Sequence, residues 1–113
     1  MDRSVKKPSG KSKRNAETMA FLESLNGGRL TFGQLLSSLR ESKEESAAVF
    51  AERLGISRQH LHQLENGLKR VSPERAVRFA RLLGQSQTYF LQLALQDLAN
   101  DSGLTARVEV KVA

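Results

Sequence analysis

Polar side chains recur at helical spacing between Arg58 and Asn66, in a stretch with a single carboxylate, Glu65. At about 100° per residue, Leu61 and Leu64 mark one face of a helix, and Glu65 falls close to that apolar side. The opposite face holds amide and imidazole groups, and Arg58 lies in the first turn. Such groups can hydrogen-bond to base edges in a DNA major groove, which admits one α-helix. The side chains on this outward face are Gln59, His62, Gln63 and Asn66.

The residues before this helix predict a partner helix and a tight turn. Gly55 can adopt the left-handed conformation that ends a helix, and Ser57 is a good N-cap for the next one. Residues 46–67 therefore predict a helix-turn-helix. The apolar stripe of its first helix consists of Phe50, Ala51 and Leu54.

Three short motifs follow in order: LR at 39–40, FAERLGIS at 50–57 and QLENG at 63–67. Their order and spacing resemble the helix-turn-helix of Xre/Cro and lambdoid phage-repressor proteins, and a looser resemblance extends over residues 30–98. The resemblance implies a lambda-repressor-like five-helix bundle that binds operator DNA. It also implies base contacts from Arg58, Gln59, His62 and Gln63, and phosphate contacts from Asn66 and the following loop.

Two positions depart from the family pattern. Ala47 stands where the family usually has a Gln that contacts the DNA backbone, and Glu45 stands where it usually has Leu. These departures favour an alternative in which the helix-turn-helix no longer binds DNA and serves as a protein-interaction module.

Basic residues surround the second motif helix. Residues 53–81 contain seven Lys or Arg against two Glu, and Lys69 and Arg70 directly follow the helix, where they are predicted to clamp phosphates. The predicted DNA-binding residues are Ser57, Arg58, Gln59, His62, Gln63, Asn66, Lys69 and Arg70.

Further start signals place the other helices of an all-α fold. Thr31 and Gln34 form a capping box, Ser72 and Pro73 begin a helix, and Ser86 caps another over residues 87–100. An additional N-terminal helix is predicted over residues 16–25. The helix after Pro73 is predicted to bury Ala76, Val77, Ala80 and Leu83.

The C-terminal part predicts contacts with another molecule. Apolar residues spread around most of the helix over residues 87–100, so that it is either a fully buried fifth helix or an interface. Residues 104–112 alternate apolar and polar side chains, which predicts a β-strand without a partner in this chain. We expect it to pair antiparallel with a second copy, with Arg107 and Lys111 near the partner's Glu109. The rival is strand addition to a different protein.

The first residues predict a separate segment. Residues 1–14 hold six Lys or Arg against one Asp, which predicts a disordered basic arm. It is either a DNA-contacting arm or a solubilising tail. The predicted organisation is an arm at 1–14, a helical DNA-binding domain at 15–102 and a strand for dimerisation or partner binding at 103–113.

The sequence shows no sign of a metal site, an enzyme active site or a membrane segment. The 113 residues include no Cys, and His60 and His62 point to different sides of a helix, so no metal site is predicted. We expect no enzyme activity and no cofactor. The chain has no signal-peptide pattern and no apolar run long enough for a membrane, so we expect a cytoplasmic protein with no membrane partner.

The sequence thus predicts a dimeric, sequence-specific DNA-binding repressor whose partners are double-stranded operator DNA and a second copy. Residues 72–95 also resemble the helices after the motif in antitoxins of the host-inhibition-of-growth type. This second resemblance implies an alternative, an antitoxin that binds DNA and a toxin.

Overall fold

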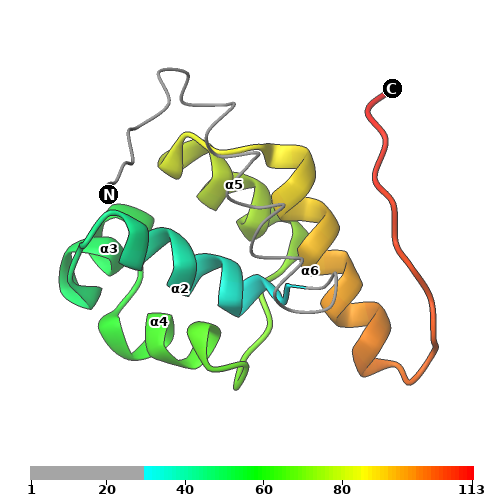
Figure 1. Cartoon of the computed structure of the whole chain (residues 1–113), viewed down its shortest axis with the longest axis horizontal. Coiled ribbons are helices and arrows are strands. Elements are labelled where there is room, and N and C mark those ends of the chain that lie inside the picture. Colours follow the sequence, from blue (N-terminus) through cyan, green and yellow to red (C-terminus); the bar gives the residue numbers. More distant parts are fainter. Residues whose placement is uncertain (1–29) are drawn as a thin grey trace, which may run out of the picture. The chain divides into compact units, whose positions relative to one another are not determined.

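The computed structural model describes residues 30–113. The described residues are all α-helical where they have regular structure, which confirms the all-α part of the predicted fold (Figure 1). The predicted basic arm at 1–14 and the predicted helix at 16–25 lie outside the described residues. The helices are α2 (Phe32–Ser42), α3 (Ala47–Leu54), α4 (Arg58–Glu65), α5 (Pro73–Leu83) and α6 (Gln87–Asp101).

Local capping determines where these helices begin. The hydroxyl of Thr31 accepts the backbone N–H of Gln34, and the Gln34 side chain accepts the backbone N–H of Thr31, which completes the predicted capping box. The predicted N-caps of α4, α5 and α6 are also confirmed. Their hydroxyls accept backbone N–H groups three residues further on, and these caps are Ser57, Ser72 and Ser86.

The helix-turn-helix forms as predicted. Gly55 ends α3 with φ of 74°, and the next backbone N–H, that of Ile56, donates to the carbonyl of Ala51 at 3.0 Å. Residues 55–57 then connect α3 to α4. Ala51 is fully buried, and α4 packs against both α3 and α2.

An aromatic cluster joins three helices. Phe32 of α2 meets Phe90 of α6 edge to face, with ring centroids 5.5 Å apart, and lies 6.5 Å from Phe79 of α5. The prediction for α5 was wrong at one position: Phe79 is buried, whereas Val77 is only half-buried. Both residues lie at the border of the apolar stripe, and the larger ring fills the space next to Phe32.

The C-terminal segment forms no β-strand within residues 30–113. A strand needs a neighbouring strand for its backbone groups, and this part of the chain contains none. The segment instead turns back at the end of α6 and runs beside that helix in the opposite direction (Figure 1). The side chains of Gln92 and Gln96 hold it there.

Candidate nucleic-acid interface

The outward face of α4 is exposed and free of carboxylates. Arg58, Gln59 and His62 are exposed, and Gln63 is half-buried. On the opposite side, Leu61 and Leu64 are buried against the core. The structure therefore brings the predicted base-contacting side chains together on one solvent-facing surface. Such a surface offers both hydrogen-bond donors and acceptors.

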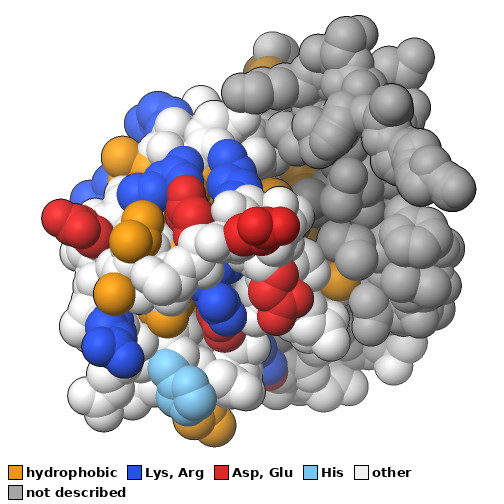
Figure 2. All heavy atoms as spheres, turned by 60° about the vertical axis from the view of Figure 1, so that its left-hand side comes forward, with side chains coloured by type: hydrophobic (Ala, Val, Ile, Leu, Met, Phe, Trp, Pro, Cys, Tyr) orange, Lys and Arg blue, Asp and Glu red, His pale blue; other side chains and the backbone are white. Residues whose placement is uncertain are grey.

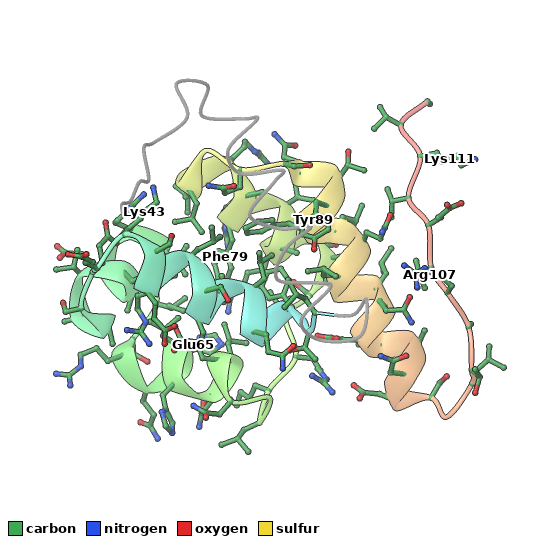
Figure 3. All side chains as sticks on the ribbon, in the orientation of Figure 1. Lys43, Glu65, Phe79, Tyr89, Arg107 and Lys111 are labelled. Atoms are coloured by element: carbon green, nitrogen blue, oxygen red, sulfur yellow. The ribbon has the colours of Figure 1, made fainter. Side chains whose placement is uncertain are left out.

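Glu65, the one acid of α4, points away from this face. Its carboxylate accepts two hydrogen bonds from the guanidinium of Arg40 in α2, at 2.9 and 3.0 Å. The Glu65 side chain is 9% exposed and lies between α4 and α2 (Figure 3). The glutamate of the QLENG motif thus fixes α4 on the scaffold and adds no repulsion toward a polyanion.

The last turn of α4 is closed by its own side chains. The Asn66 amide donates to the backbone carbonyl of His62 at 2.8 Å and lies 3.2 Å from the Nδ1 atom of that residue. Both side chains are exposed, so each keeps further hydrogen-bonding capacity at the surface. At the other end of the helix, the Ser57 hydroxyl accepts the backbone N–H of His60 at 3.0 Å.

His60 connects α4 electrostatically to the basic residues around it. Burial lowers the pKa of His60, and the positive charges of Arg75 and Lys69 lower the pKa further. Both effects disfavour the charged imidazolium form. Arg75, in the first turn of α5, and Lys69 therefore lie close enough to His60 of α4 for their charges to act on its imidazole.

Arg70 is bound differently from Lys69. Its guanidinium donates to both carboxylate oxygens of Asp101 in α6, at 2.7 and 2.8 Å, and lies 3.6 Å from the buried carboxylate of Asp97. These contacts raise the pKa of Arg70 and lower that of Asp101. Both predicted phosphate clamps are exposed, and Arg70 in addition ties the loop to α6.

A basic hollow of about 510 Å³ lies along α5. Arg75, Arg78 and Arg81 recur every three residues on this side of the helix, and Glu74 is the one acid among the residues that line the hollow. The remaining lining residues are Arg70 and Ser72. The structure thus extends positive charge from the α4 region along α5.

The start of α3 has a different charge character. Glu45 forms an ion pair with Arg53 across α3, and Ala47 occupies the first position of the helix. Glu45, which precedes the N-cap Ser46, therefore compensates the charge of Arg53 in α3. Figure 2 shows a face on which acidic and basic side chains are intermixed, with a histidine side chain exposed below them. Positive charge near α4 is thus local and does not cover the whole surface.

Sequence reasoning missed the electrostatic link between His60 and the cations Arg75 and Lys69. His60 was considered as a metal ligand together with His62 but not as a neighbour of cations, because spacing within one helix does not show which cations of other elements lie near it. Arg75 lies three residues after the Ser72 cap, in the first turn of the helix that follows the motif. This position was the available signal that its charge lies near α4. The Arg70–Asp101 pair could not be found in this way, because the two residues are separated by 31 positions.

Within residues 30–113, no three His, Cys, Asp or Glu residues gather in a way that could hold a metal ion. None of the helices in this part of the chain is long and apolar enough to cross a membrane.

A family model described as a helix-turn-helix domain matches residues 31–89. This match spans more than half of the 113 residues and includes α2 to α5 completely. It confirms the resemblance to Xre/Cro-like helix-turn-helix proteins. Comparison with curated proteins and with solved structures gives no significant match. The motif, the packing of α3 on α4 and the family match agree: the chain belongs to the helix-turn-helix domain family.

Proposed function

We propose that this protein is a sequence-specific DNA-binding transcriptional regulator that acts as a dimeric repressor, with α4 as its recognition helix. Repression follows if the bound protein occupies a promoter. The observation that carries the proposal is the surface of α4: its outward side chains are exposed and uncharged or cationic, whereas Glu65 is turned inward onto Arg40.

The proposed contacts divide into two groups. Arg58, Gln59, His62 and Gln63 contact base edges, because Gln59, His62 and Gln63 share the outward face of α4 and the exposed Arg58 lies in its first turn. Phosphates are contacted by the groups at the margins of that face, which fix the register of the helix on the duplex. These marginal groups are Ser57, Asn66, Lys69 and Arg75, with Arg70 holding the loop in place.

The first experiment measures binding of the full chain to random duplex DNA at several salt concentrations, followed by selection of the preferred site from a random pool. We expect binding that weakens steeply with salt, because cationic side chains release counterions from DNA. Enrichment of one sequence supports a sequence-specific regulator. A chain that binds no duplex at low salt is instead a protein-interaction module, and this outcome contradicts the proposal.

A second candidate function is an antitoxin that binds DNA and a toxin. Apolar side chains remain exposed at the C-terminal end: Leu98 is 41% exposed and Leu104 is 65% exposed. A small toxin reading frame beside the gene supports this candidate. If the neighbouring frame is expressed and is toxic, co-expression of this chain must relieve the toxicity; toxicity that persists contradicts the antitoxin function.

A further inference from the structure

The C-terminal segment is attached to α6 through alternate residues. The Gln96 side chain donates to the carbonyl of Ala106 at 2.7 Å and accepts the backbone N–H of Val108 at 2.7 Å. The Gln92 side chain accepts the backbone N–H of Val110 at 3.1 Å. Two glutamine amides, one helical turn apart, thus take the place of a neighbouring strand on one edge of this segment.

The other edge of the segment is open. In extended backbone, the N–H and C=O groups of successive residues point to opposite edges, so the groups of Arg107 and Glu109 face away from Gln92 and Gln96. These groups make no backbone hydrogen bond with another residue in 30–113. Burial alternates in the same way, since Ala106, Val108 and Val110 are half-buried. The intervening side chains are exposed, and these are Thr105, Arg107, Glu109 and Lys111.

We propose that this open edge pairs with the same edge of a second copy, in an antiparallel ribbon whose two-fold axis passes Val108. The pairing deepens the proposed function, because it gives the repressor its dimer. With this axis, Arg107 lies opposite the partner's Glu109, and Val108 lies opposite its own copy. Backbone groups of the odd-numbered residues then bond across the ribbon, while those of Val108 and Val110 remain bonded to α6.

Charge and length select this register. An axis at Glu109 places Glu109 opposite itself and Arg107 opposite Lys111, which are like-charged pairs. An axis at Val110 leaves residues 104–106 without a partner strand. The axis at Val108 pairs the whole segment and forms two Arg107–Glu109 pairs. The side chains of Arg107 and Glu109 are both exposed. Figure 3 shows Arg107 and Lys111 on the segment beside α6.

Cysteine cross-linking tests the register, because the native chain contains no Cys. In Val108→Cys the two sulfurs lie in directly opposed positions, with Cβ atoms about 5 Å apart, so that mild oxidation should give a covalent dimer. In the matched variant Val110→Cys the two positions are offset by four residues, and we expect no cross-link. A covalent dimer from Val110→Cys, or none from Val108→Cys, overturns the proposal.

A charge exchange tests the same pairing in solution. Arg107→Glu places carboxylates opposite each other twice and should weaken self-association about tenfold. The double variant Arg107→Glu with Glu109→Arg restores opposite charges and should restore the dimer. Lys111→Glu is the control, since Lys111 faces Thr105 in this register and the dimer should persist. Sedimentation equilibrium measures all three without DNA, so the result is independent of the DNA-binding function.

A chain ending at Ser102 completes the test. It lacks the whole segment and should sediment as a monomer, while its far-UV circular dichroism should keep the helical signal of α2 to α6. A truncated chain that is still a dimer places the interface elsewhere, on α6. A full chain that is monomeric would mean that the open edge does not pair with a second copy and is available to a different protein. A dimeric truncated chain or a monomeric full chain overturns the proposal.

Discussion

Lys69 and Arg70 are adjacent, carry the same charge and were both predicted to clamp phosphates, but Arg70 is also bonded to Asp101 in α6, so we expect Lys69 to act mainly on DNA. Lys69→Ala should weaken binding to every duplex alike and lower the salt slope by about one unit, because it removes one phosphate contact. The melting temperature of the free protein should stay unchanged. Binding measured against salt concentration checks this, and a defect confined to one DNA sequence contradicts the assignment.

Arg70→Ala should instead lower the melting temperature, because it removes the bonds to Asp101 in α6 and a cation near buried Asp97. Burial already raises the pKa of Asp97, and Arg70 opposes that rise. The variant should therefore raise this pKa further. Thermal unfolding and a carboxyl NMR titration measure both effects. If both remain as in the native chain, the Arg70 bonds do not stabilise the loop.

The pKa of His60 should report the basic surroundings of α4. Since Arg75 lowers this pKa, Arg75→Gln should raise it, whereas Arg78→Gln, which removes a cation other than the two that lower this pKa, should change it much less. The folded state disfavours the imidazolium, so the contribution of His60 to stability is present above its unfolded pKa and is lost as the pH falls from there through its lower folded pKa. An NMR titration of the imidazole checks the prediction. Equal shifts in both variants would show that Arg75 is not the neighbour.

Bound DNA should shift the same group in the opposite direction. Phosphates near His60 would favour the imidazolium, so DNA binding should raise the pKa of His60. Binding near this pKa should therefore be accompanied by proton uptake. The affinity of the native chain should then increase with decreasing pH more than that of His60→Gln.

At the scale of the elements, Gly33 controls the distance between α2 and α4. A Cβ atom at this position would lie 2.2 Å from the backbone carbonyl oxygen of Leu64 and 2.9 Å from that of Glu65. Gly33→Ala must therefore push α4 away from α2, and it should cost about 1 to 3 kcal/mol of stability, as overpacking does. Urea unfolding measures the loss, with Glu41→Ala on the exposed side of α2 as the control. Equal stability of the two variants would mean that the helices do not approach so closely.

The helices also show which structural features can be predicted from the sequence and which depend on packing. Helix starts were predicted because each depends on a hydroxyl and an N–H three residues apart, as at Ser57 and Ser72. The bonds of Arg70 to Asp101 were not predicted, because they depend on how the loop packs on α6. The choice of Phe79 over Val77 likewise depends on the neighbouring Phe32. For the C-terminal segment, the alternation at 104–112 was recognised, but the role of Gln92 and Gln96 was not.

At the scale of the whole molecule, dimerisation should appear in the DNA site. A two-fold symmetric protein favours an inverted repeat whose half-sites lie about 34 Å apart, one turn of DNA, or a multiple of that distance. The chain ending at Ser102 should bind one half-site as well as the full chain does, but it should lose the gain from the second half-site. Binding to duplexes with one and with two half-sites checks this. A full chain that gains nothing from the second half-site contradicts the dimeric repressor.

The central claim is that α4 distinguishes base sequences through Gln59 and Gln63. The most direct test is the affinity of Gln59→Ala and Gln63→Ala for the selected duplex and for random duplex, with Gln87→Ala, an exposed residue at the start of α6, as the control. We expect a loss of about 1 to 3 kcal/mol for each variant on the selected duplex, little change on random DNA, and no change for the control. An equal loss on both duplexes, or no loss on either, would contradict this claim.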